Sequence, residues 1–236
     1  MNDRSLISYS FNTAWFLFKG NWKTMIGVAI LLFALVMVAN ALGFILFEEE
    51  SMSYAFWNFG VFIFSGWLAL GLYRVFLAIA SGESVSVKKL FSQGIAPVLF
   101  FVIASMLYGL VVGVGFILLI IPGIFVGIKL YFYDIIIADK HYDPIKALKT
   151  SWALTKGHWW QLLGLLVLLI LLNLAGMMAL GVGLIITVPV SAMGLVCAYR
   201  YVSSLNETLE EDQEQGSGGS KEQTGESFTE EEMTAS

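Results

Sequence analysis

The chain has 236 residues, of which 58% are hydrophobic and only 13% are charged, against about 45–50% and about 25% in ordinary soluble domains. This composition excludes a soluble globular domain, because too few polar side chains are present to cover a water-exposed surface. The net charge is −5, but the residues after Ser204 carry −9 and the rest of the chain carries +4. A positively charged hydrophobic body suits a bilayer with anionic headgroups and gives no support for nucleic-acid binding.

Apolar runs of about 20 residues, the length that crosses a bilayer as a helix, occur in three pairs. They predict an all-α integral membrane protein with six transmembrane helices, at residues 25–47, 55–80, 96–119, 121–137, 159–174 and 178–201. Pro122 and Gly123 are expected at a break between the third and fourth spans, with Pro122 in a first helical turn. Pro189 lies inside the sixth span, where it is expected to kink the helix.

Lysine and arginine residues gather on one side of the predicted membrane. They occur before the first span and in the loops after the second and fourth spans, whereas the three opposite loops contain none. Because basic residues are retained on the cytoplasmic side, this distribution predicts that both termini are cytoplasmic.

An internal repeat relates the first and third pairs of spans. A shift of 137 positions aligns six identical residues within a window of thirteen. The aligned pairs are Trp15 with Trp152, Leu17 with Leu154, Lys19 with Lys156, Gly20 with Gly157, Trp22 with Trp159 and Gly27 with Gly164. The predicted unit is one short amphipathic helix followed by two spans, and it occurs three times, at about residues 5–80, 84–140 and 143–203.

The short helices are expected to lie in the headgroup plane, because their apolar and basic side chains occupy different faces. In the third unit, Asp143 is suited to cap the helix and Pro144 to begin it. The expected apolar stripe is Ile145, Leu148 and Trp152, with lysines roughly 100° around the helix from it.

The candidate binding residues are tryptophans and bases expected at the membrane boundary, where they anchor a protein to lipid headgroups. They are Trp15, Lys19, Trp22, Arg74, Lys129, Lys146, Lys149, Trp152, Lys156, Trp159 and Arg200. Arg74, Lys129 and Arg200 lie within spans, near their cytoplasmic ends, which favours snorkelling to the headgroups or lipid-phosphate binding over a substrate pathway. Asp134 could neutralise a neighbouring base. The main polar residues near the midplane are Asn40, Asn58 and Asn173.

The sequence contains no recognisable catalytic motif. Asp139, His141 and Asp143 alternate in one loop, as in a cation site or a proton relay, but solvation of the loop explains this pattern equally simply. The paired glycines Gly113 and Gly115, and likewise Gly181 and Gly183, indicate close helix approach or a re-entrant bend rather than a nucleotide loop. We therefore expect a protein that is not an enzyme, with no metal site and no cofactor.

Residues 204–236 are expected to form a disordered acidic cytoplasmic tail, because they lack apolar periodicity and are rich in Glu, Ser, Gly and Gln. Flexible acidic segments can recruit basic partners. The tail is therefore the one segment in which the sequence suggests a protein partner.

Two stretches resemble a known bacterial pattern. They contain Ile120, Ile121, Pro122, Gly123 and Ile124, and then Ala147, Leu148, Ser151, Trp152, Leu154, Thr155, Lys156, Gly157, Trp159 and Leu162. The chain resembles the YciC-like group of uncharacterised inner-membrane proteins, related to the membrane domain of some glycerophosphodiester phosphodiesterases. The resemblance implies a six-helix domain in the bacterial inner membrane. It implies no hydrolase activity, because the sequence lacks the catalytic domain of those enzymes.

Three functions fit these observations. The leading hypothesis is a non-enzymatic membrane protein that organises or senses inner-membrane lipid, with anionic lipids as partners. The first alternative is a small-solute transporter or channel, since transporters are often built from repeats. The second alternative is a membrane-bound adaptor that acts through the acidic tail.

Overall fold

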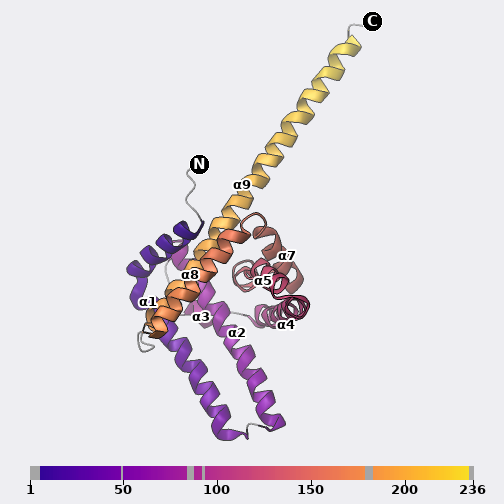
Figure 1. The fold of residues 1–236 in the computed structure, drawn as a ribbon. Helices are drawn as coiled ribbons and strands as arrows, with labels where there is room; N and C mark the ends of the chain where they lie inside the picture. The colour runs from indigo at the N-terminus through magenta and orange to yellow at the C-terminus, as the bar shows by residue number, and fades with distance from the viewer. Residues whose placement is uncertain (1–5, 49, 84–87, 92–93, 179–182, 234–236) are drawn as a thin grey trace. The chain divides into compact units, whose positions relative to one another are not determined.

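The computed structural model describes residues 6–48, 50–83, 88–91, 94–178 and 183–233, and every regular element in these ranges is a helix (Figure 1). The helices are α1 (Leu6–Leu46), α2 (Met52–Ala80), α3 (Lys88–Phe91), α4 (Ile95–Leu118), α5 (Ile120–Lys129), α6 (Tyr133–Lys140), α7 (Pro144–Leu154), α8 (Trp159–Met178) and α9 (Leu184–Met233). Six stretches of the described residues are long and apolar enough to cross a membrane. They are α1, α2, α4, Ile120–Lys140, α8 and Leu184–Thr208.

The first pair of spans is a hairpin of α1 and α2. α1 joins the expected amphipathic helix to the first span through a kink at Asn21, whose backbone angles (φ −125°, ψ 20°) are not helical. The side-chain amide of Asn21 donates to the Leu17 carbonyl at 3.2 Å. The boundary between the amphipathic helix and the first span is therefore a bend directly after Gly20, and not the end of one helix and the start of another.

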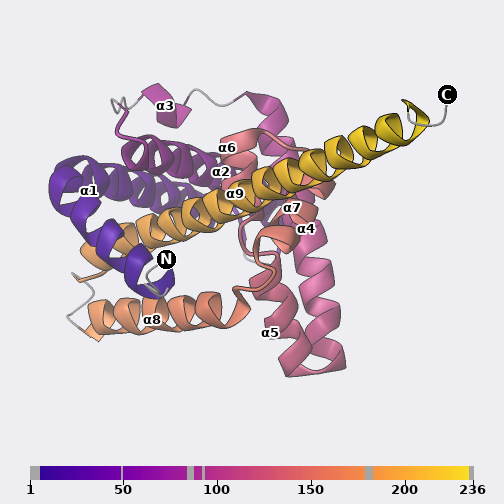
Figure 2. The ribbon, with the colours of Figure 1, turned by 90° about the horizontal axis from the view of Figure 1, so that it is seen from above.

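α4 and α5 lie side by side as a second hairpin (Figure 2). Leu119 (φ −165°, ψ 150°) is the extended residue between them, so the break precedes Pro122, which lies in the first turn of α5. The helices approach closely at Gly115, where a Cβ would lie 2.9 Å from the Cα of Gly123. A Cβ on Gly113 would meet nothing within 4 Å. The expected close approach therefore occurs at Gly115 and not at Gly113.

The fourth predicted span, residues 121–137, is not one helix, which corrects the sequence expectation. α5 ends at Lys129, residues 130–132 form a turn, and α6 begins at Tyr133. The turn contains neither glycine nor proline, the residues that normally reveal a helix break in a sequence. Its cause lies in contacts from a later helix, described with the candidate site.

α8 and α9 form the third pair. The side-chain amide of Asn173 in α8 donates to the Ser191 hydroxyl in α9 at 2.8 Å. The backbones meet at Gly176, where a Cβ would lie 3.1 Å from the carbonyl carbon of Gly183. Pro189 lies inside α9, which continues as a helix on both sides of it. Residues 179–182 lie outside the described part of the chain.

A short helix precedes the second and third pairs, but the two differ in length. α3 has 4 residues and α7 has 11. Gly157 after α7 has a positive φ of 87°, whereas its aligned partner Gly20 lies within α1. The threefold repeat therefore stays a prediction.

The expected disorder of the acidic tail stays a prediction, and in the structure α9 continues as a helix to Met233. Glutamate, glutamine and lysine are good helix formers. The expectation of disorder is based on the lack of apolar periodicity and does not include this helix propensity. The chain divides into two compact units, Met1–Tyr199 and Arg200–Ser236. The first contains the helix pairs and the candidate site.

Candidate functional site

The turn between α5 and α6 is held by residues of α7 and its C-terminal end. The Ser151 hydroxyl donates to the Lys129 carbonyl at 3.0 Å and accepts from the Phe132 amide at 3.1 Å. The Thr155 hydroxyl lies 3.1 Å from the same carbonyl. Backbone groups freed by a break within a membrane must find partners in the protein. These two hydroxyls provide them, and both residues are fully buried.

α7 buries its small residues rather than its apolar stripe. Ala147, Ser151 and the adjoining Thr155, spaced four residues apart, are each 0% exposed. Ile145 is 62% exposed and Trp152 is 42% exposed. The small residues therefore pack against the protein, and the apolar stripe stays on the outer surface, where a membrane would supply lipid.

Lys129, at the end of α5, lies among aromatic rings. Its ammonium nitrogen is 5.6 Å from the ring centroids of both Phe125 and Trp152. Phe125 also packs against Trp159, with 5.4 Å between ring centroids. Lys156 is near enough to interact electrostatically with Lys129. We call these five residues the Lys129 cluster, and four of them are among the predicted anchoring residues.

An open groove of about 620 Å³ lies between α4 and the start of α7. It is lined by Ile103, Leu107, Asp143, Pro144, Ile145, Lys146 and Lys149. Asp143 occupies the N-cap position of α7, but its side chain makes no capping hydrogen bond, contrary to the sequence expectation. We call this surface the α4–α7 groove, and it combines exposed apolar side chains with two lysines.

The matching residues of α1 are more open. The Lys19 ammonium lies 5.9 Å from the ring centroid of Trp15, which stacks on Phe18 at 5.7 Å. Trp15 and Trp22 are 42% and 49% exposed. Sequence identity with the third unit therefore does not produce a second enclosed cluster here. Arg200 belongs to the second compact unit.

Arg74, near the end of α2, binds the end of α6. Its Nε donates to the Ala138 carbonyl at 3.2 Å, and its Nη2 contacts Nε2 of His141. Asp139 instead accepts a hydrogen bond from the Tyr199 hydroxyl at 2.8 Å. Arg74 thus caps a helix C-terminus. Among the described residues, no group of three or more His, Cys, Asp or Glu side chains is placed to hold a metal ion.

Asp134 lies among tyrosines. Its carboxylate accepts from the Ile135 amide at 2.8 Å and interacts electrostatically with Tyr73, Tyr131 and Tyr133. The charged side chain that interacts electrostatically with Lys129 is Lys156, not Asp134. The expected neutralisation of a neighbouring base by Asp134 is therefore not seen in these contacts.

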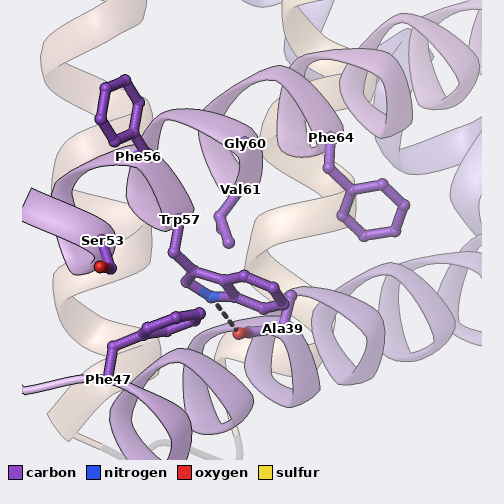
Figure 3. Close-up of a pocket in the computed structure, with 8 residues that line it drawn as sticks. All are labelled: Ala39, Phe47, Ser53, Phe56, Trp57, Gly60, Val61 and Phe64. Carbon is purple, nitrogen blue, oxygen red and sulfur yellow. Dashed lines mark hydrogen bonds between the residues drawn. The ribbon is translucent and has the colours of Figure 1, made fainter.

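A second groove, of about 590 Å³, lies between α1 and α2 (Figure 3). The Trp57 indole N–H donates to the Ala39 carbonyl at 3.0 Å, and its ring packs against Phe47 with 5.6 Å between centroids. The ring also lies against Gly43, where a Cβ would collide with it. Ser53 is the polar side chain in an otherwise apolar lining. This groove joins two helices and has no charged side chain for a headgroup.

Sequence reasoning missed Ser151, Thr155 and Phe125. The two hydroxyls leave a weak signal, since small residues recur every four positions from Ala147, a spacing typical of close helix packing. Phe125 leaves no signal, because it is one apolar residue within an apolar run.

The helical architecture and its six apolar stretches define a multi-pass helical membrane protein. Residues 54–209 match the model of a family described as a domain of unknown function, DUF7847, and the chain belongs to this family. No curated protein and no solved structure matches the chain. The matched region contains both the Lys129 cluster and the α4–α7 groove. The relationship to the YciC-like group stays a prediction.

Proposed function

We propose that this is a non-enzymatic membrane protein that binds anionic lipid of the inner membrane beside α7. The α4–α7 groove carries the proposal. An acyl chain can lie along Ile103 and Leu107, while Lys146 and Lys149 offer positive charge to the headgroup phosphate. A lysine close to an anionic membrane surface contributes about 1 kcal/mol of attraction.

The role of α7 in the fold supports lipid sensing rather than passive contact. The helix that lines the groove also provides Ser151, which holds the break between α5 and α6. A lipid that binds one face of α7 therefore acts on the helix that stabilises the fourth span. Sensing requires that α7 has two arrangements and that the lipid binds one of them more tightly than the other, because only a difference in affinity shifts their populations.

Native mass spectrometry with phosphatidylglycerol and phosphatidylcholine tests lipid retention directly. The double variant Lys146→Gln/Lys149→Gln should retain phosphatidylglycerol about thirtyfold less, because two favourable charges of about 1 kcal/mol each are removed. The matched control is Lys19→Gln/Lys23→Gln, which removes the same charge from α1. Equal retention by the wild-type protein and the α7 variant would contradict the proposal, and so would an equal loss in both variants.

Transport ranks second. The break at residues 130–132 supports it, because discontinuous helices often form transporter sites. However, Ser151 and Thr155 already satisfy the freed backbone groups. The side-chain amides of the three midplane asparagines, Asn40, Asn58 and Asn173, each donate to a carbonyl four residues earlier in the same helix. Solute flux into proteoliposomes that disappears in Asn173→Leu would reverse this ranking.

A further inference from the structure

Among the described residues, the Lys129 cluster contains one buried donor without an acceptor and one cation without a carboxylate beside it. The indole N–H of Trp159 is buried and makes no hydrogen bond. Lys129 is only 6% exposed, and within the described part of the chain its ammonium contacts aromatic rings and no carboxylate. Both groups can only donate. A buried N–H without an acceptor is unfavourable, and the Lys129 ammonium beside it has aromatic rings rather than an acid as neighbours. An anion at this place would satisfy both groups.

The same cluster lies at the start of α8, which has 20 residues. The amide of Leu162 donates to the His158 carbonyl at 3.0 Å, so the amides at residues 159–161 have no acceptor within the helix. Such an end carries partial positive charge and favours anions. Gly157, with φ 87°, turns the chain into α8. Lys156, beside this turn, adds a second full positive charge.

We propose that the Lys129 cluster binds a phosphate oxyanion, from either a lipid headgroup or free inorganic phosphate. A phosphate group accepts several hydrogen bonds at once, which matches the Lys129 ammonium, the Trp159 indole N–H and the first amides of α8. Lys156 contributes charge at the edge of the site. The residues differ from those of the α4–α7 groove, so this inference does not depend on lipid binding there.

The test is calorimetric titration of the full-length protein in detergent micelles. One probe is inorganic phosphate. The other is dihexanoyl phosphatidic acid, with dihexanoyl phosphatidylcholine as a lipid of equal chain length. Lys129→Met, which keeps an unbranched side chain one atom shorter but removes the ammonium, should weaken binding at least about tenfold, since a hydrogen bond to a charged group is lost. Trp159→Phe, which keeps a ring against Phe125 but removes the N–H, should weaken binding about threefold to tenfold.

The two probes separate the sources. Binding of inorganic phosphate alone, weakened in Trp159→Phe, assigns the site to free phosphate. Binding of phosphatidic acid alone assigns it to a headgroup if Trp159→Phe weakens that binding, because lipid in the α4–α7 groove does not contact Trp159. Unchanged affinity in Trp159→Phe, or no binding of either probe to the wild-type protein, would overturn the proposal. This holds even if Lys129→Met fails to fold. Lys146→Gln/Lys149→Gln serves as the control, because it should lose lipid from the groove while keeping phosphate binding.

Discussion

Ser151 replaces the helical partners that the backbone loses between Lys129 and Phe132. A hydroxyl can donate and accept at the same time, so one side chain meets a carbonyl and an amide. In a water-exposed turn, solvent would meet both needs. Within a bilayer no such solvent is present, and the protein must supply the partner itself.

Replacing Ser151 with alanine should therefore destabilise the protein. We expect Ser151→Ala to lower the free energy of unfolding by about 1–3 kcal/mol, since a buried amide loses its partner. Unfolding by denaturing detergent in mixed micelles measures this change. Thr150→Ala, at the neighbouring half-buried position, is the control and should stay close to the wild-type value. Equal stability of the two variants would contradict the assigned role of Ser151.

The residues of the Lys129 cluster were only partly predictable. Trp152, Lys156 and Trp159 are visible in the sequence because tryptophan and lysine recur at matching positions. Their meeting with Lys129 is not visible, since it depends on α7 folding back across residues more than twenty positions earlier in the chain. Ser151 reads as an ordinary polar residue until its partners are known.

At the scale of elements, hydropathy predicts where the membrane-spanning stretches lie, but it does not predict where a helix within them breaks. Runs of apolar residues place all six membrane-crossing stretches, because the length of such a run is a local property of the sequence. The break after Lys129 depends on Ser151, and the bend at Asn21 has no proline beside it. Only the break lies beyond a reading of local sequence pattern, because the bend falls directly after Gly20, at the expected end of the amphipathic helix.

The α4–α5 hairpin gives a matched test of close helix approach. Gly115→Ala should destabilise the protein by about 1–3 kcal/mol, because the new methyl group would overlap the backbone at Gly123, which cannot rotate away. Gly113→Ala, two residues earlier, meets open space and should be neutral or stabilising by up to about 1 kcal/mol, since alanine favours helix. Thermal unfolding in one detergent compares the variants, and an equal loss in both would contradict the packing described.

At the scale of the whole molecule, the sequence separates a basic body from an acidic end, while the structure supplies the helix pairs. The net charges of +4 and −9 meet at Ser204. The compact units divide close by, between Tyr199 and Arg200. The change in composition lies close to this division, and the helical form of the second unit is consistent with glutamate and glutamine, whose helix formation needs no buried apolar face.

The distribution of bases predicts which side of the membrane each loop faces. A reporter fused after Glu50 should lie outside the cytoplasm, and one fused after Glu214 should lie inside it, because basic loops are retained in the cytoplasm. Paired reporters that are active on opposite sides of the membrane measure this orientation. Finding both fusion points on the same side would refute the predicted topology.

The break in the fourth span also has a consequence for synthesis. Ser151 follows Phe132 by 19 residues, and at roughly 5–20 residues per second the ribosome needs on the order of one to four seconds to add them. During that interval, the turn at residues 130–132 has been synthesised while the hydroxyl that completes it does not yet exist. The order in which the spans enter the membrane is therefore not the order in which they are finished, and the fourth is completed only once α7 has been translated.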